Sequence, residues 1–194
     1  MVAVQPVQEE RIVLHHVSWD TYEHLVQDHA NASTPRFTYD RGTLEIMSPL
    51  SVHERYSRFF DLFMAVFAEE TDTEVRGFGS TTFKRQDLQQ GFEADACFYV
   101  QQAHRVRGKD NIDLRTDPPP DLVMEIDVTH SSLDKLPIVA QVGVPEAWRY
   151  NGERLQFWVL TGDHYESAAH SRVLPLVPVG SLEALLRQGK GLDY

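Results

Sequence analysis

The sequence predicts a single α/β domain, and three observations carry that prediction. Segments in which apolar residues alternate, as in strands, are interspersed with segments in which they recur at helical spacing. No repeat, low-complexity tract or linker-like stretch divides the chain, and 194 residues suit one well-filled domain. The apolar fraction of 42% and the charged fraction of 24% are ordinary for a globular protein. We therefore expect one domain over residues 1–194, with residues 1–10 as a flexible arm.

The first half of the chain contains two predicted helices and a predicted hairpin. We expect, in order, a short strand over residues 11–16, a helix over 18–30, a β-hairpin over 36–47 and a long helix over 52–70. Ser18 is a suitable N-cap for the first helix. The hairpin turns at Asp40-Arg41-Gly42, between two runs that alternate. The second helix has a broad apolar stripe, which indicates that it packs on the core.

The second half predicts further strands, two helices and a second hairpin. We expect strands over 74–76, 81–84, 93–100 and 122–128, a helix or irregular excursion over 101–117, a helix from Ser132 to near Gly143, a hairpin over 146–160, strands over 163–167 and 172–174, and a closing helix from Ser181 to near Gly189. Ser131 or Ser132 could cap the middle helix. Asn151-Gly152 is the strongest hairpin signal in the chain.

Residues 118–135, PPPDLVMEIDVTHSSLDK, are the stretch that most strongly indicates a functional site. Three prolines fix an extended entry, and the apolar run that follows is short enough for a buried strand. Asp121, Glu125 and Asp127 share one face of that strand, because strand side chains alternate faces. Like charges on a buried strand are costly unless something compensates them, and a bound cation is the usual remedy. Lys135 follows in the next helix and could reach back toward this face.

Asp95 and Glu125 are both acids set inside apolar strands. If the two strands pair in one sheet, their carboxylates could converge on a divalent cation, and such hard oxygen ligands favour Mg²⁺ or Mn²⁺ over zinc. The cation could polarise a phosphodiester and lower the pKa of an attacking water. Lys135 could orient that water or stabilise charge on the phosphate. Glu45, late in the first hairpin, could supply a further carboxylate.

Four blocks of the chain, taken in order, resemble one known family. They are GTLEIMSPLSVHE, GFEADACFYV, PPPDLVMEIDVTHSSLDKLPI and GVPEAWRY. An acid in one strand, followed in the next by a second acid with a nearby Lys, resembles the pattern of the PD-(D/E)XK nucleases. The fuller blocks are similar to the Uma-two family of restriction-endonuclease-like proteins, earlier a domain of unknown function. The resemblance covers most of residues 37–160.

The resemblance implies a central mixed β-sheet flanked by helices, with added β-hairpins, and Mg²⁺-dependent cleavage of DNA. Carried over, Asp95 and Glu125 are the metal ligands. These two acids and Lys135 are then the catalytic residues, and Glu45 joins them as a predicted catalytic residue from its own place in the chain, just before the long helix. The chain departs from the superfamily pattern where Asp127, rather than Lys, stands two residues after Glu125. Lys135, in the following helix, is the matching amine.

Each candidate residue also has a structural explanation. Asp95 and Glu125 could be ion-paired acids rather than ligands. Asp127 could bind a metal, support Lys135 or serve structure alone. His53 could orient a water or cap the long helix.

Composition leaves two further functions open. The formal net charge of −11 argues against a broad basic surface for nucleic acid, although a local basic patch is compatible with it. The alternatives to a nuclease are a non-catalytic binding or assembly module with the nuclease fold, and a metal-dependent hydrolase of a small phosphate ester. DNA is the expected partner, and a homodimer is expected because cutting both strands needs two sites.

The compartment is predicted from cysteine content and hydropathy. The single cysteine, Cys97, excludes an internal disulfide and fits the reducing cytoplasm. No apolar run approaches the roughly 18 residues that a membrane span needs.

Overall fold

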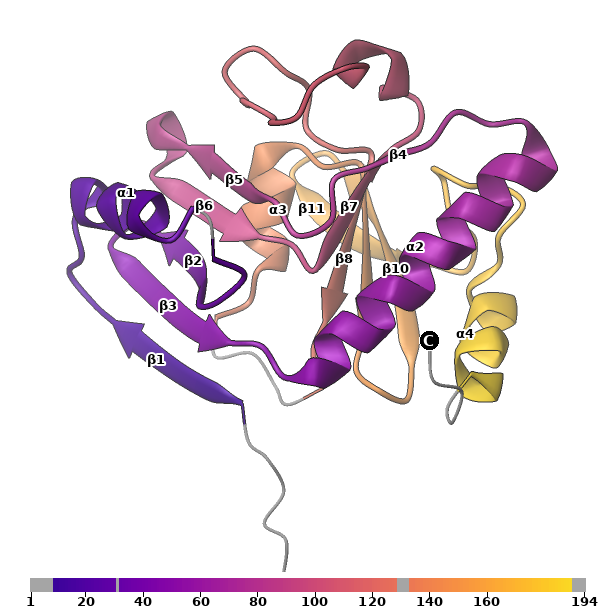
Figure 1. The fold of residues 1–194 in the computed structure, drawn as a ribbon, viewed down its shortest axis with the longest axis horizontal. Coiled ribbons are helices and arrows are strands. Elements are labelled where there is room, and N and C mark those ends of the chain that lie inside the picture. Colours follow the sequence, from indigo (N-terminus) through magenta and orange to yellow (C-terminus); the bar gives the residue numbers. More distant parts are fainter. Residues whose placement is uncertain (1–8, 31, 129–132, 190–194) are drawn as a thin grey trace, which may run out of the picture.

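The computed structural model describes residues 9–30, 32–128 and 133–189, which form two β-sheets and the helices that cover them (Figure 1). The elements of the first half are β1 (Glu10–Leu14), α1 (Trp19–Asp28), β2 (Arg36–Asp40), β3 (Thr43–Ser48), α2 (Ser51–Thr71), β4 (Arg76–Gly77), β5 (Thr82–Arg85), β6 (Gln90–Glu93) and β7 (Ala96–Tyr99). Those of the second half are β8 (Leu122–Ile126), α3 (Leu136–Val142), β9 (Glu146–Tyr150), β10 (Leu155–Thr161), β11 (His164–Ala168) and α4 (Val179–Gln188). Two single 3₁₀ turns, Gln86–Leu88 and Ala103–Val106, lie in loops.

The two sheets confirm the expected mixed α and β class. One has five strands in the order β1-β3-β2-β6-β5 and is antiparallel throughout. The other has six strands in the order β11-β10-β9-β8-β7-β4. This sheet is mixed. Strands β8 and β9 run parallel and are joined through α3, whereas the other neighbouring strands of the sheet pair antiparallel. None of the described helices has the length and apolar character needed to cross a lipid bilayer.

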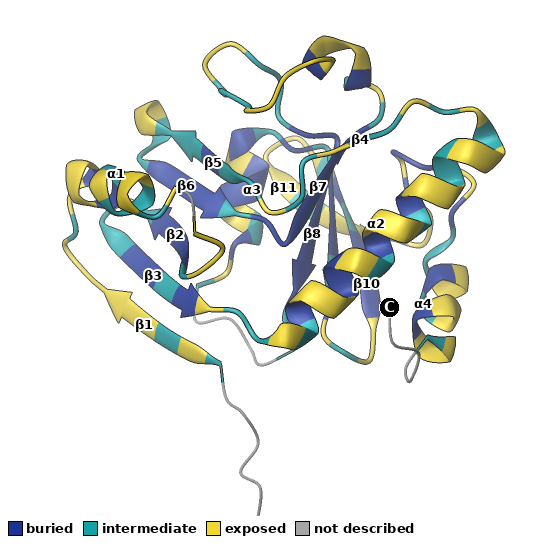
Figure 2. Ribbon diagram, in the orientation of Figure 1, coloured by how far each residue is buried: buried dark blue, intermediate teal, exposed yellow. Residues whose placement is uncertain are grey.

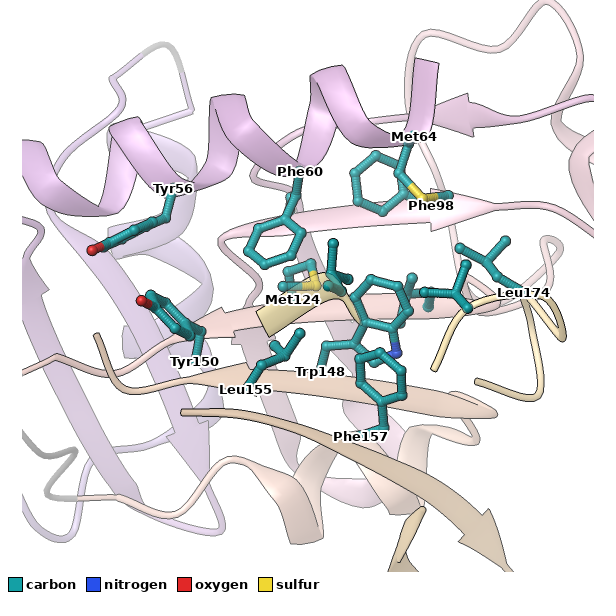
Figure 3. Packing of buried hydrophobic residues seen from close by; sticks show 14 of the residues in the cluster. Tyr56, Phe60, Met64, Phe98, Met124, Trp148, Tyr150, Leu155, Phe157 and Leu174 are labelled. Atoms are coloured by element: carbon teal, nitrogen blue, oxygen red, sulfur yellow. The ribbon is translucent and has the colours of Figure 1, made fainter. Parts of the chain in front are cut away.

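The main core lies between the six-stranded sheet and helices α2 and α4. Phe60 and Met64 of α2 point into this core, where Phe60 lies edge-on to Trp148, and Trp148 stacks on Phe157 with ring centroids 4.3 Å apart (Figure 3). Each such fully buried side chain stabilises the fold by roughly 2 kcal/mol. The central strands β7, β8 and β9 of this sheet are buried along most of their length, while α2 keeps an exposed outer side (Figure 2). The amphipathic helix predicted over 52–70 is therefore confirmed as a core helix.

The other face of the six-stranded sheet is covered by α3, and the five-stranded sheet is covered by α1. Ile138 and Val139 of α3 pack with Val123 of β8 in a second cluster. Trp19 and Tyr22 of α1 pack on Tyr39 of β2 in a third. Ser18 caps α1 as predicted, because its side chain accepts a hydrogen bond of 3.1 Å from the amide of Thr21.

The strand predicted over 93–100 is in fact two strands that belong to different sheets. β6 ends at Glu93 in the five-stranded sheet, and β7 begins at Ala96 in the six-stranded sheet. Between them the carboxylate of Asp95 accepts a 2.7 Å hydrogen bond from the amide of Ile126. A side chain thus takes the place of a backbone acceptor in the ladder, and the chain passes from one sheet to the other at Asp95.

The helix predicted from Ser132 begins later, at Leu136. Pro137 stands in its first turn, where the missing N–H costs nothing, but its ring prevents the helix from extending further toward the N-terminus. Asp134 and Lys135 therefore precede the helix rather than lie in its first turns. Ser131 and Ser132, the predicted caps, lie outside the described residues. Gly143 ends the helix as expected, with a positive φ of 88°.

Three predictions in the last third of the chain are corrected. The turn at Asn151 spans residues 151–154, because the side-chain oxygen of Asn151 accepts from the amides of Glu153 and Arg154. Residues 172–174 form no strand, since the amides of Arg172 and Val173 donate instead to the carboxylate of Glu146. α4 begins at Val179 with Pro178 at its N-cap, so the helix starts two residues before the predicted cap, Ser181.

Glu146 is consequently a structural acid, and its replacement should destabilise the protein. Its residue exposure is 0%, and it also accepts from the indole of Trp148. In Glu146→Gln an amide N–H₂ faces one of these donors, so the free energy of unfolding should fall by about 1–3 kcal/mol. Urea unfolding measures the change. Glu153→Gln, at an exposed position, is the control and should stay within about 0.5 kcal/mol of wild type. Equal stability of the two variants would contradict this role.

Candidate active site

The predicted site residues gather where the two sheets meet. β7 and β8 pair with Ala96 opposite Met124, so Asp95 and Glu125 are neighbours at the end of this pairing. The amide of Asp95 donates to the carbonyl of Met124 at 3.1 Å, and the Asp95 carboxylate accepts from Ile126. These two bonds lie on either side of Glu125. Asp95 and Glu125 lie close together because β7 pairs with β8, a pairing that was assumed, not predicted, from the sequence.

Glu125 and Lys135 form a nearly buried ion pair. Lys135 Nζ donates to Glu125 Oε2 at 2.8 Å and to the carbonyl oxygen of Glu93 at 3.2 Å. The two side chains are only 9% and 10% exposed, so the charges interact with little screening by water. Glu125 Oε1 is also buried, and it has no hydrogen-bond partner among the described residues. One oxygen of Glu125 is thus held by the amine, while the other remains available to a ligand.

The two oxygens of Asp95 are both engaged. Oδ1 accepts from Arg36 Nη1 and lies 3.2 Å from His53 Nδ1, and Oδ2 accepts from the amide of Ile126. Arg36 is 3% exposed and also lies 3.3 Å from a carboxylate oxygen of Glu54. Sequence reasoning missed Arg36, because a single Arg at the start of a hairpin strand carries no signal that a partner 59 residues away will bury it.

His53 lies between two carboxylates in the interior. Its Nδ1 faces Asp95, and its Nε2 is 3.0 Å from Glu9 Oε1. Burial lowers the pKa of His53 to about 4, and the positive charges of Arg36, Lys135 and Arg11 act in the same direction, against the opposing effect of Glu9. The ring is therefore neutral at pH 7. Its contact with Asp95 connects α2 to the junction between the two sheets, so His53 does more than cap the helix.

Glu45 lies in the same region and ties two segments together. Its Oε1 accepts from Arg11 at 3.0 Å, which joins β3 to β1. Its Oε2 accepts from the amide of Leu133 at 3.2 Å, which holds the segment before α3. Both oxygens are used in these contacts. Glu45 thus supports the segment that carries Lys135.

A further acid of this region, the half-buried Glu93, was not foreseen. It is the last residue of β6, and its carboxylate lies 3.6 Å from the guanidinium of Arg36. Burial raises the pKa of Glu93, although Arg36 and Lys135 lower it, and the charge of Glu125 adds to the rise. The sequence signal was its place two residues before Asp95, within the block that resembles the family.

Glu125 lines a small pocket. Acids and bases line it in equal number, namely Glu125, Asp127 and Asp134, and Arg11, Lys135 and Arg149. Arg149 forms an ion pair with Asp127, which the sequence left open as a ligand, a support or a structural acid. The local balance of charge at this pocket is neutral, unlike the net charge of −11 of the whole chain.

The residues fit a divalent cation in part. Glu125 Oε1 is a buried hard oxygen without a partner among the described residues, which is the donor that Mg²⁺ or Mn²⁺ prefers. Asp95 could add a second such oxygen only if Arg36 and His53 release Oδ1. Within the described ranges no three His, Cys, Asp or Glu side chains are grouped closely enough to hold a metal ion. The metal-binding and catalytic roles of these residues thus stay predictions.

Comparison with known proteins adds a family and a fold. The model of the Uma2 family, described as "Putative restriction endonuclease", matches residues 19–189. A crystal structure described as "a putative nuclease belonging to DUF820 from Anabaena variabilis ATCC 29413" is similar, with a TM-score of 0.60 and 12% identity. The similarity covers 88% of this chain and 99% of that chain, and at this identity it shows a shared fold. No curated protein matches the sequence.

Proposed function

This chain belongs to the Uma2 family, and from that membership we propose that it is a Mg²⁺- or Mn²⁺-dependent endonuclease that hydrolyses DNA phosphodiester bonds. The single observation that carries the proposal is Glu125. It is an acid in the middle of a buried strand, with one oxygen held by Lys135 and the other without a partner among the described residues. A structural acid in such a place normally has both oxygens satisfied.

In this proposal Glu125 and Asp95 hold the cation, which would polarise the phosphodiester and lower the pKa of a bound water. Lys135 has two tasks. Its present bond to Glu125 Oε2 fixes the carboxylate beside the pocket and leaves Oε1 without a partner among the described residues. Its remaining donor capacity can then hold the attacking water or stabilise charge that develops on the phosphate. Glu45 acts through its bond to the Leu133 amide, which keeps Lys135 in place.

The net charge of −11 would repel DNA from the chain as a whole, but the pocket itself is not acidic. Three basic side chains, Arg11, Lys135 and Arg149, surround Glu125 and offset the local acids. The buried, unpaired thiol of Cys97 is consistent with the cytoplasm as the proposed compartment. Cutting both strands of a duplex would need two sites, so we also expect two copies to act together, which sedimentation on DNA would reveal.

The test of the proposal is cleavage of supercoiled plasmid and of labelled duplex DNA by the purified protein. We expect cleavage with Mg²⁺ or Mn²⁺, none with EDTA, and recovery when the cation is returned. A folded protein that binds no Mn²⁺ and cuts nothing would instead support a non-catalytic module. Hydrolysis of p-nitrophenyl phosphate esters without cleavage of polynucleotides would support a small-ester hydrolase.

A further inference from the structure

Arg149 is a basic residue beside Glu125 that no step above requires. It lies on β9, and the parallel register pairs it directly with Glu125 of β8. Side chains of residues paired in this way project from the same face of a sheet. Both side chains line the same pocket. Arg149 is therefore a neighbour of the residue that the proposal assigns to the cation.

The described residues leave most of the hydrogen-bonding capacity of Arg149 unused. In the described part of the chain its guanidinium has one partner, Asp127, which accepts from Nη2. A guanidinium carries five N–H donors in a planar fork. Asp127 thus holds the fork in one orientation, while Nε and Nη1 keep donors that it does not use. The side chain is 32% exposed, so a ligand that enters the pocket can reach it.

The other two bases of the pocket are more deeply committed to protein carboxylates. Lys135 is 9% exposed and bonds to Glu125, and Arg11 is 12% exposed and contacts both Glu9 and Glu45. Arg149 is thus the most accessible of the three. Its fork also matches two oxygens of a phosphate, which a Lys ammonium cannot do.

We infer that Arg149 is a phosphate-binding residue that holds non-bridging oxygens of the DNA backbone next to Glu125. The inference rests on the proposed function and adds the group that anchors the substrate. In the free protein Asp127 orients the guanidinium. In the complex the phosphate takes the donors that Asp127 leaves unused, and the phosphodiester is held at the pocket despite the acidic charge of the chain.

The test is the salt dependence of DNA binding, measured by fluorescence anisotropy with a labelled duplex in a Glu125→Gln background, so that the duplex is not cut. Arg149→Gln should weaken binding about tenfold. The slope of log affinity against log salt should fall in magnitude by about one, because one phosphate contact is lost. Arg149→Lys should keep the slope and recover only part of the affinity, since it keeps the charge and loses the fork. Arg154→Gln, which removes the same charge from an exposed loop, should change affinity less than about twofold.

A second set of variants in the same binding experiment changes Asp127. Asp127→Asn should tighten DNA binding, because it frees the remaining donor of Arg149 and removes a nearby negative charge. Most of that gain should disappear when Asp127→Asn is combined with Arg149→Gln, because the freed donor is then absent. Circular dichroism of each variant verifies the fold, and Arg149→Lys keeps a cation for Asp127 should Arg149→Gln fail to fold.

The outcomes distinguish failure of the inference about Arg149 from failure of the proposed nuclease function. If the duplex binds but Arg149→Gln has the affinity and salt slope of its parent, the inference is overturned and the nuclease proposal stands. If Asp127→Asn tightens binding equally with and without Arg149, the effect is one of general charge and the inference also fails. A protein that neither binds nor cuts DNA overturns both.

Discussion

The Glu125→Gln variant should lose DNA cleavage on the order of a thousandfold while it keeps its fold. A glutamine has nearly the same shape, and its amide oxygen can still accept from Lys135, which now bonds to Glu125 Oε2 at 2.8 Å. A neutral amide is, however, a poor ligand for a hard cation. The loss of a few kcal/mol of stabilisation from the cation corresponds to two or three powers of ten in rate.

Single-turnover cleavage of a labelled duplex measures this effect, and Mn²⁺ titration by electron paramagnetic resonance provides a readout that does not depend on activity. Binding of Mn²⁺ should weaken in parallel with cleavage. The control is Glu166→Gln, which removes an equal charge from an exposed strand at the sheet edge and should leave both quantities unchanged. Full cleavage by Glu125→Gln would place the chemistry elsewhere in the chain and refute the proposed role.

The Arg36→Gln variant should lose roughly 3–5 kcal/mol of unfolding free energy. Arg36 is 3% exposed and pairs with Asp95, whose side chain is 1% exposed. Removal of one partner leaves a buried carboxylate without its main counter-charge, which is far more costly than the loss of a surface pair. Chemical unfolding measures the change. Arg85→Gln breaks a pair with Asp87 whose side chains are 30% and 63% exposed, and it should cost less than about 1 kcal/mol.

The Arg36→Gln variant should also lose less stability than wild type as the pH falls, because Arg36 is one of the charges that lower the pKa of His53. In wild type the pKa of His53 is lowered by burial to about 4, so its contribution to stability is present above about pH 6.5 and is lost as the pH falls through 4. Without Arg36 one of the positive charges that lower this pKa is gone, so the folded-state pKa of His53 should rise from about 4 toward its unfolded value. The variant should then lose less of the His53 contribution than wild type as the pH falls below about 6.5. The stability gap should therefore be smaller at pH 5 than at pH 8, and a constant gap would contradict this coupling.

Local pattern in the sequence was sufficient for most of the elements. The stripe of α2, the cap at Ser18 and the first hairpin all depend on residues that are close neighbours along the chain. The buried strand that carries Glu125 is of this kind too, because a short apolar run after prolines has few other solutions. The start of α3 was also encoded locally, in Pro137, although the serines before it gave a competing cap signal.

At some positions contacts between distant residues override the local pattern, and only the tertiary structure shows which positions these are. Asp95 divides one apolar run into two strands because it bonds to the backbone 31 residues away, and Glu146 prevents a strand at 172–174 in the same manner. The partner of Asp95 likewise comes from a hairpin strand 59 residues away. The family resemblance named Asp95, Glu125 and Lys135. It did not name the buried Arg36, which binds the Asp95 oxygen that a cation would otherwise use. Periodicity reports which face of an element is apolar, whereas the pairing of buried charges depends on which elements meet in space.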